Sequence, residues 1–305
     1  MTQALIVGLG SIGSRHVRLL REAGCDVAMV SRRPHVEMRC FLTLHQALEA
    51  TQPDYVVIAT ETAAHIDSLL NLVEAQYDGR VLIEKPLDVF HRKLPENRFR
   101  LAAVAYNLRF HPLLAALKNA LRGQNVISAQ IYCGQYLPDW RPGTDYRHSY
   151  SSQTALGGGV LRDLSHELDY LLWLFGACER VAAIGGKNGP LDIRSDDSWG
   201  MLMSLANCPI ATVQINYLDR PGRREIVVNT AEHTYAADLS QGKLVTDGVP
   251  TNIACERDET YRLQHRAMLS DDAQPSLCTL EQGEAVMKLI SAVEQAAATG
   301  QWVLC

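Results

Sequence analysis

The sequence predicts an α/β protein of two domains, the first built on a parallel sheet and the second on an open, mainly antiparallel sheet. Three observations support this. Over roughly the first hundred residues, short apolar runs alternate with amphipathic segments, a pattern typical of parallel strands covered on both faces by helices. A glycine-rich loop directly follows the first run. Beyond Pro112, strand-like segments follow one another through short turns, as in an antiparallel sheet.

The elements of the first domain alternate along the chain. The expected strands are residues 4–7, 27–30, 55–59, 81–83 and 101–105, and the expected helices are residues 12–23 and 65–75. The strands are apolar almost throughout, so both of their faces should be buried. We expect this domain to comprise residues 1–110.

The second domain, residues 111–305, combines helices with longer strands. Helices are expected at residues 113–121 and from the glycines at 157–159 to residue 175. The expected strands are residues 126–136, 180–184, 198–205, 210–217, 224–229 and 233–239. A last amphipathic helix, about 280–298, has the length to pack back toward the first domain.

The composition is that of a folded protein without a strong charge bias. Of 305 residues, 47% are hydrophobic and 21% charged, and the net charge is −5, which argues against a nucleic-acid-binding surface. No stretch approaches the roughly 20 apolar residues of a membrane span, and no basic leader precedes the first strand. The eight cysteines lie singly, without the C-x-x-C spacing of a zinc or redox site. We expect reduced thiols in a cytoplasmic protein.

The loop after the first strand has the spacing of a dinucleotide site. Gly8 allows a tight turn, Gly10 allows the backbone to approach a pyrophosphate, and Gly13 allows the helix to pack closely on the strand. Ser11 and Ile12 open that helix, whose N-terminus attracts negative charge. A purely structural glycine turn is the alternative. The strand before the loop and the helix after it favour a dinucleotide-binding Rossmann domain.

The end of the second strand bears on which dinucleotide binds. NAD-binding domains usually place an acidic residue there to hold the ribose hydroxyls, whereas this chain has Ser31, Arg32 and Arg33. Guanidinium groups make bidentate hydrogen bonds to phosphate, so they suit a 2′-phosphate. These residues favour NADP(H), with NAD(H) as the alternative. If instead both arginines are simply solvated at the strand end, they favour neither dinucleotide over the other.

Two further segments carry candidate catalytic groups. Glu84, Lys85 and Pro86 follow a parallel strand, at the sheet edge where ligands bind in such folds, although this tripeptide alone is an ordinary surface turn. Asp163 and His166 lie three residues apart on an expected helix and should share a face. A histidine beside a carboxylate can act as acid or base. A buried structural histidine and a metal ligand are the alternatives for His166, and we expect no metal.

Taken together, these motifs resemble the Gfo/Idh/MocA family of oxidoreductases, the group of glucose–fructose oxidoreductase and inositol dehydrogenase. The similarity covers essentially the whole chain. The shared segments are residues 8–16, 59–65, 84–86, 106–110 and 157–169. The resemblance implies a Rossmann domain and an α/β domain whose open sheet carries the substrate side and often dimerises, so we expect a homodimer or homotetramer.

The resemblance also implies roles for individual residues. Lys85 would assist proton transfer, and His166 aligns with the catalytic histidine of the family. The expected cofactor-binding residues, besides the glycine loop and residues 31–33, are Thr60, Glu61, His65, Glu84, Lys85 and Pro86. Many relatives place the aspartate one residue further from the histidine, where this chain has Arg162, so the family role does not transfer directly to Asp163.

Candidate substrate contacts gather in a polar loop, residues 136–147. Aromatic faces pack on sugar rings, while arginine and aspartate make directional hydrogen bonds. The candidates there and elsewhere are Asn107, Arg109, Trp140, Arg141, Asp145, Tyr146, Arg162 and His166. The loop resembles that of members linked to bacterial surface-glycan sugar biosynthesis.

The combined prediction is an NAD(P)-dependent oxidoreductase acting on CH–OH groups. It would transfer hydride between nicotinamide and a secondary alcohol or ketone of a sugar, nucleotide sugar or sugar acid. One alternative is a reductase of a non-sugar substrate on the same fold, which should have a more apolar pocket. Another is a catalytically inactive dinucleotide sensor, against which the presence of Lys85 and His166 argues.

Overall fold

The computed structural model describes residues 1–32, 38–141, 143–272 and 274–305, and the chain forms two compact units. The first unit contains Met1–Asn107 and Asp258–Glu284, and the second contains Leu108–Arg257 and Ala285–Cys305. Each unit is therefore assembled from two segments of the chain. The sequence pattern predicted that the chain passes from the first domain to the second only once, near residue 110.

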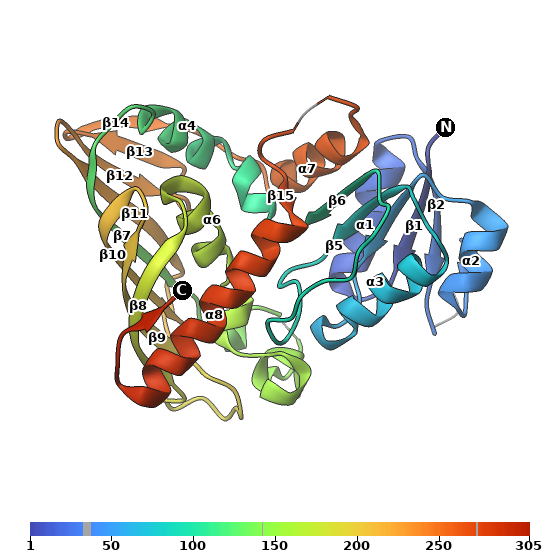
Figure 1. The fold of residues 1–305 in the computed structure, drawn as a ribbon, viewed down its shortest axis with the longest axis horizontal. Coiled ribbons are helices and arrows are strands. Elements are labelled where there is room, and N and C mark those ends of the chain that lie inside the picture. The colour runs from blue at the N-terminus through green and yellow to red at the C-terminus, as the bar shows by residue number, and fades with distance from the viewer. Residues whose placement is uncertain (33–37, 142, 273) are drawn as a thin grey trace. The chain divides into compact units, whose positions relative to one another are not determined.

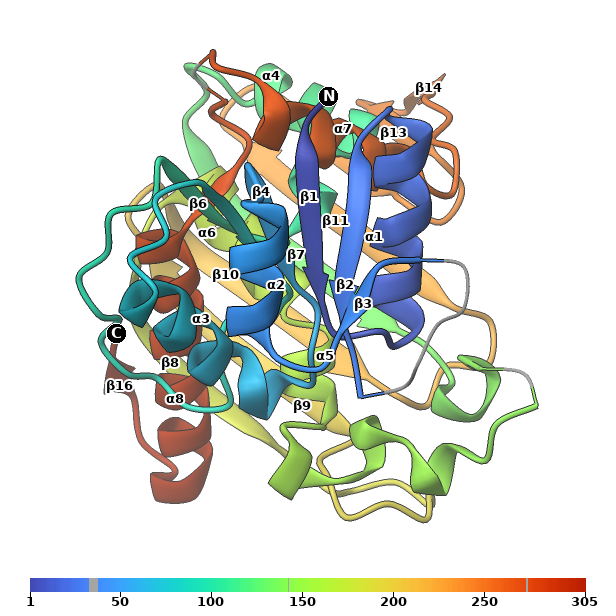
Figure 2. The same cartoon turned by 90° about the vertical axis from the view of Figure 1, so that its right-hand side faces the viewer.

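The first unit is built on a seven-stranded sheet with the order β15-β6-β5-β4-β1-β2-β3. Its strands are β1 (Gln3–Val7), β2 (Asp26–Val30), β3 (Cys40–Phe41), β4 (Tyr55–Ile58), β5 (Arg80–Ile83), β6 (Leu101–Val104) and β15 (Cys278–Thr279). All are parallel except the edge strand β15, which runs antiparallel to β6. Figure 2 shows β1 between β2 and β4. The strand order reverses at this point, and open parallel sheets bind ligands at the carboxyl ends of such strands.

Four α-helices lie entirely within the described residues of the first unit. They are α1 (Ser11–Glu22), α2 (Leu44–Thr51), α3 (His65–Glu74) and α7 (Glu259–Leu269). β4 and β5 are buried along their whole length, as continuously apolar parallel strands should be. α7 belongs to the segment that returns from the second unit, and it packs against α1.

The second unit is built on a nine-stranded sheet with the order β14-β13-β12-β11-β7-β10-β9-β8-β16 (Figure 1). Its strands are β7 (Val126–Gly134), β8 (Cys178–Gly186), β9 (Ser198–Leu205), β10 (Cys208–Asn216), β11 (Arg223–Thr230), β12 (Thr234–Asp238), β13 (Lys243–Thr246), β14 (Val249–Asn252) and β16 (Val303–Leu304). Among the described strands of this sheet, only β7 and β10 pair in parallel. Buried and exposed side chains largely alternate along β9, so one face of the sheet packs inward.

The helices of the second unit include α4 (Pro112–Ala120), α5 (Val160–Asp163) and α6 (His166–Phe175), and α8 (Leu280–Thr299) begins in the first unit and continues into the second. α4 packs against β12 and β13, and α5 against β9 and β10. The predicted fold class, a Rossmann domain with a C-terminal α/β domain on a mainly antiparallel sheet, is confirmed. None of the helices formed by the described residues has both the length and the apolar character needed to cross a bilayer.

Two thiols that lie 127 residues apart in the sequence meet in the second unit. β16 pairs antiparallel with β8, matching Val303 with Val181. This pairing brings the Sγ atoms of Cys178 and Cys305 to 2.6 Å from each other, and both residues are partly buried. Sequence spacing could not reveal the pair, because it arises only from the strand pairing.

We expect mild oxidation to join these two thiols. One equivalent of hydrogen peroxide should convert Cys178 and Cys305 into a disulfide, with two molecules of water as the other product. Closing so long a loop constrains the unfolded chain and should stabilise the fold by about 4 kcal/mol. Peptide mapping by mass spectrometry under non-reducing conditions would identify the linked peptides. Recovery of both cysteines as separately alkylated thiols would contradict the expectation, and Cys255→Ser, which removes a partly buried thiol outside this pair, is the matched control.

Candidate functional site

The glycine loop holds the first helix against the ends of two strands. Gly8 has φ +101°, and its N–H donates to the carbonyl oxygen of Val30 at 3.0 Å. A Cβ added to Gly8 would lie 2.6 Å from the carbonyl oxygen of Ala59, and one added to Gly13 would overlap the carbonyl oxygen of Gly8. Both positions therefore require glycine. Gly10 differs, because a Cβ there would have nothing described within 4 Å.

The N-terminus of α1 is suited to an anion. Gly10 is its N-cap residue, and in the part of the chain that the structure describes no side chain caps the helix and no acidic residue lies in its first turn. Its first N–H groups and the helix dipole can therefore face a negatively charged ligand. Ser11 is exposed and Ile12 half-buried at this end. Gly10 gives such a ligand space to reach the backbone.

Three predicted cofactor residues, Ser31, Arg32 and Thr60, lie at the carboxyl ends of strands beside this loop. The backbone N–H of Ser31, at the end of β2, donates to the carbonyl oxygen of Phe41, and Arg32 is exposed. Arg33 lies outside the described residues. At the end of β4, the hydroxyl of Thr60 is buried without a hydrogen-bond partner among the described residues. A buried polar group without a partner is costly in a native fold, so Thr60 is suited to bind a ligand atom.

His65 connects the ends of β4 and β5, while the neighbouring Glu61 is exposed. The ring Nδ1 of His65 lies 2.9 Å from the carbonyl oxygen of Pro86, and Nε2 lies 3.1 Å from that of Thr60. Burial lowers the pKa of His65 despite these acceptors. A neutral ring can donate only one hydrogen bond at a time. His65 therefore lies between the Glu84-Lys85-Pro86 segment, in which the Lys85–Pro86 peptide bond is cis, and the loop after β4, and it donates to one of them at a time.

Glu84 lies at one end of a buried chain of hydrogen bonds. Its Oε1 lies 2.8 Å from Nε2 of His16, whose Nδ1 lies 2.9 Å from Nε2 of His265, and Nδ1 of His265 lies 3.0 Å from the hydroxyl of Tyr55. The other carboxylate oxygen of Glu84 accepts from the backbone N–H of Lys85 at 3.2 Å. Sequence reasoning singled out Glu84 and Lys85 but assigned no role to His16 and missed His265.

Burial and neighbouring groups together set the charge state of this hydrogen-bonded chain. Burial acts to raise the pKa of Glu84, but the hydrogen bond from His16 and the charge of Lys85 hold that pKa below its ordinary value. Burial, and then the neighbouring His16, lower the pKa of His265 well below its ordinary value. Burial raises the pKa of Tyr55 well above its ordinary value. Glu84 is therefore ionised at neutral pH, whereas His265 and Tyr55 are neutral.

Asp163 and His166 fall on two different helices. α5 ends at Asp163, and α6 begins at His166 after a break at Leu164, whose backbone angles are not helical. The helical-spacing argument that put them on one face is therefore wrong. The carboxylate of Asp163 is buried and accepts hydrogen bonds from the hydroxyls of Tyr150 at 2.8 Å and Tyr217 at 2.6 Å. His166 is half-buried at the first position of α6.

Three predicted substrate contacts are buried polar groups with partners inside their own unit. Arg109 is 2% exposed and donates through both Nε and Nη2 to Asp169, the shortest distance being 2.7 Å. Arg162 pairs with Glu294 at 2.7 Å. In the first unit, the amide of Asn107 donates to the hydroxyl of Thr260 at 2.6 Å. Such pairs fix the backbone around them, which suits positioning roles better than direct substrate contact.

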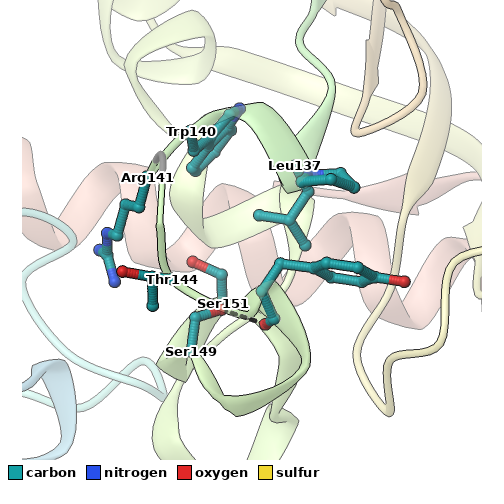
Figure 3. Close-up of a pocket in the computed structure, with 8 residues that line it drawn as sticks. Leu137, Trp140, Arg141, Thr144, Ser149 and Ser151 are labelled. Atoms are coloured by element: carbon teal, nitrogen blue, oxygen red, sulfur yellow. Dashed lines mark hydrogen bonds between the residues drawn. The ribbon is translucent and has the colours of Figure 1, made fainter.

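Three of the other predicted substrate contacts, Trp140, Arg141 and Tyr146, line a recess in the second unit. Figure 3 shows Trp140 and Arg141 among its lining side chains, and Tyr146 also lines it. The indole of Trp140 packs edge-on against Tyr217 at 5.2 Å, and its Nε1 is buried with no hydrogen-bond partner among the described residues. Tyr217 also donates to Asp163. The recess is therefore linked to the candidate catalytic aspartate through one tyrosine.

Asp145 lies apart from this arrangement of buried groups. It is exposed and forms an ion pair with Arg147, whose hydrogen bonds lower the pKa of Asp145 to about 2. It also caps the short helical turn that contains Tyr146. Across the described ranges, no group of three His, Cys, Asp or Glu side chains is placed to hold a metal ion.

Comparison with known proteins assigns both halves of the chain to one family. The family model described as "Oxidoreductase family, NAD-binding Rossmann fold" matches residues 2–94, and the model described as "GFO/IDH/MocA C-terminal domain" matches residues 125–236. Together they span more than half of the chain. Among curated proteins, no sequence matches it.

Several solved structures share the fold over the whole chain. GenD2 from gentamicin A biosynthesis, in complex with NAD, is 23% identical with a TM-score of 0.82, covering 100% of this chain and 96% of that one. The WlbA dehydrogenase from Bordetella pertussis, in complex with NADH and UDP-GlcNAcA, is 18% identical with a TM-score of 0.82, covering 100% and 98%. Levoglucosan dehydrogenase, in complex with NADH and L-sorbose, is 16% identical with a TM-score of 0.83, covering 100% and 98%. At these identities the likeness concerns the fold alone.

The buried neutral histidines predict acid sensitivity. Both His65 and His265 have pKa values below the ordinary 6.5 in the folded protein, so between the two values the unfolded chain binds protons that the folded chain does not. The contribution of these neutral histidines to the free energy of unfolding should be fully present above pH 6.5. It should fall as the pH drops, by up to about 1.4 kcal/mol per pH unit for each histidine. Urea unfolding at several pH values between 7.5 and 5 would measure this. His265→Gln should reduce the slope, and equal stability at pH 7 and pH 5 would refute the expectation.

Proposed function

The chain belongs to the Gfo/Idh/MocA family of NAD-binding oxidoreductases, and on that premise we propose that it transfers hydride between a nicotinamide dinucleotide and a sugar-type secondary alcohol or ketone. The proposal rests on two features at the carboxyl ends of the adjacent strands β1 and β4, where the strand order reverses: the open backbone at Gly10 and the buried hydroxyl of Thr60, which has no hydrogen-bond partner among the described residues. Homodimer or homotetramer formation and a cytoplasmic location are part of the same proposal.

We propose that the N-terminus of α1 holds the pyrophosphate of the dinucleotide. Ser11, Ile12 and Gly13 would direct backbone N–H groups toward it, while Gly10 leaves room for close approach. Thr60 would donate or accept through its hydroxyl, which lacks a partner in the described part of the chain. The bound nicotinamide would supply or accept the hydride.

The proposal favours NADP(H) as the dinucleotide. Arg32 is exposed at the end of β2, where an NAD-specific domain usually has an acidic residue. An exposed guanidinium at this position can make charge-assisted hydrogen bonds to a 2′-phosphate. GenD2 and WlbA are described with NAD and NADH, respectively, so NAD(H) is the competing assignment.

We assign the proton transfer to Lys85 and His166. An alcohol that loses hydride must also lose its hydroxyl proton, and a positioned amine or imidazole can take it. Lys85 follows β5, with its backbone fastened by Glu84 and with His65 holding the next residue. Asp163, which accepts from two tyrosines, would orient the loop that lies between α5 and α6 rather than take the proton itself.

The proposed substrate class is a sugar, a nucleotide sugar or a sugar acid. The recess beside Trp140 combines an aromatic ring with polar groups, including Arg141 and Tyr146, and such surfaces recognise sugar rings and hydroxyls. The structures of similar fold include one described with UDP-GlcNAcA and others described with levoglucosan and L-sorbose. These three compounds, with each dinucleotide in both redox states, form the first turnover screen.

Two glycine variants test the dinucleotide site. Gly10→Ala should fold normally, because its Cβ meets no described atom within 4 Å, yet weaken dinucleotide binding at least tenfold by occupying the space for the pyrophosphate. Gly13→Ala is the contrast, since its Cβ overlaps Gly8 and should lower the melting temperature. Fluorescence titration with NADPH and NADH, beside thermal unfolding, would separate the effects. Unchanged affinity in a folded Gly10→Ala protein would remove the pyrophosphate from this loop.

A substitution of Lys85 tests the catalytic assignment. Lys85→Ala should lower kcat by about 100-fold or more, on the order expected for a lost proton-transfer group, while the protein still binds the dinucleotide. Stopped-flow absorbance of the reduced nicotinamide would follow the hydride step. Lys118→Ala, a lysine of α4 that packs on Trp173, is a matched control for loss of a partly buried lysine. Full turnover by the Lys85→Ala enzyme would rule out the assignment.

A further inference from the structure

Tyr55, His265, His16 and Glu84 form one continuous buried hydrogen-bonded chain. They come from four different elements of the first unit, namely β4, α7, α1 and the end of β5. Their exposed fractions are 0%, 2%, 0% and 7%, and the three links measure 3.0, 2.9 and 2.8 Å. Burying four polar groups is costly compared with an apolar core, so the arrangement calls for an explanation beyond packing.

Each link needs one hydrogen, which fixes the direction of the whole chain. An ionised Glu84 can only accept, so Nε2 of His16 must donate to it. If His16 is neutral, its Nδ1 then accepts from Nε2 of His265. The remaining Nδ1 of His265 accepts from the hydroxyl of Tyr55. This assignment satisfies every donor and acceptor in the chain with two neutral rings and a single negative charge, at Glu84.

Other titratable groups lie around the chain. Lys85, His65 and Asp88 are near Glu84 and its loop, and Tyr261 of α7 contacts the ring of His16 edge-on at 5.9 Å. Cys25 and Tyr77 act on Tyr55 from the other end. The charged groups cluster at the Glu84 end, and the Tyr55 end is neutral. Each member of the hydrogen-bonded chain therefore donates to the next, from Tyr55 through His265 and His16 to Glu84.

We propose that Tyr55, His265 and His16 are positioning residues, which keep Glu84 ionised and oriented so that it holds Lys85 in place. Glu84 accepts from His16 with one oxygen and from the backbone N–H of Lys85 with the other. A carboxylate fixed in this way holds the backbone of Lys85 through the hydrogen bond from its N–H. The inference rests on the proposed function, because it explains how the assigned proton-transfer group is held.

The first test measures the proton positions in the hydrogen-bonded chain directly and needs neither dinucleotide nor substrate. Long-range ¹H–¹⁵N correlation spectra of histidine-labelled protein report which ring nitrogen carries the proton. We expect His16 and His265 each to carry a ring proton on Nε2 at pH 7.5, as the donor directions require, with His16→Gln and His265→Gln used to assign the signals. A His16 ring protonated at Nδ1 alone would overturn the proposal.

The second test separates the two ends of His265. Glutamine places its amide nitrogen near the position of Nε2 and can still donate to His16, whereas asparagine reaches only the position of Nδ1 and can still accept from Tyr55. The probe is acetic anhydride, which modifies neutral amines, with the Lys85 peptide quantified by mass spectrometry. We expect His265→Asn to accelerate acetylation of Lys85 about threefold and His265→Gln to leave it near the parent rate.

Glu84→Gln is the positive control, since it removes the charge itself and should accelerate acetylation at least as much. If Glu84→Gln accelerates it but His265→Asn does not, the histidines do not act on Lys85. If neither variant changes the rate, Glu84 does not hold Lys85. Circular dichroism of each variant confirms folding before the comparison. These experiments measure no turnover. An inactive parent protein would therefore refute the proposed function but would leave the results of these experiments unchanged.

Discussion

The close approach of α1 to the ends of β1 and β4 is the constraint on which the first unit depends. It requires a glycine with positive φ at position 8 and a helix without a Cβ at position 13. Those two residues bring the N-terminus of α1 to the point where the strand order reverses. Thr60, at the end of β4, and the Glu84-Lys85-Pro86 segment, after β5, then lie at the same edge of the same sheet. Functional groups from distant parts of the sequence are thus assembled by one backbone contact.

Much of this unit is readable from the sequence, because its physical signals are local. The parallel strands are apolar runs, and the glycine spacing reports the turn and the close packing directly. Glu84 and Lys85 could be selected by their place after a strand. The second unit was also readable at the level of its strands, since alternation along β9 and β10 follows from one buried face.

What could not be read depends on contacts between distant residues or on unusual burial. The sequence pattern does not predict α7, because the face that this helix buries includes Thr260, Gln264 and His265 instead of an apolar stripe. The break before His166 carries no glycine or proline to announce it. The ion pair of Arg109 with Asp169 joins residues 60 positions apart, so no spacing rule could have revealed it.

The return of residues 258–284 to the first unit affects how this protein can be made and rearranged. During synthesis, β15 and α7 emerge only after nearly all of the second unit, so the first unit cannot complete its sheet or enclose His16 while its own early residues leave the ribosome. A gene fragment ending at residue 107 would lack the β15 pairing of β6 and the partner of His16. The nucleotide-binding half is therefore not a contiguous cassette. Recombination that exchanges it between relatives would have to carry two separate stretches of sequence together.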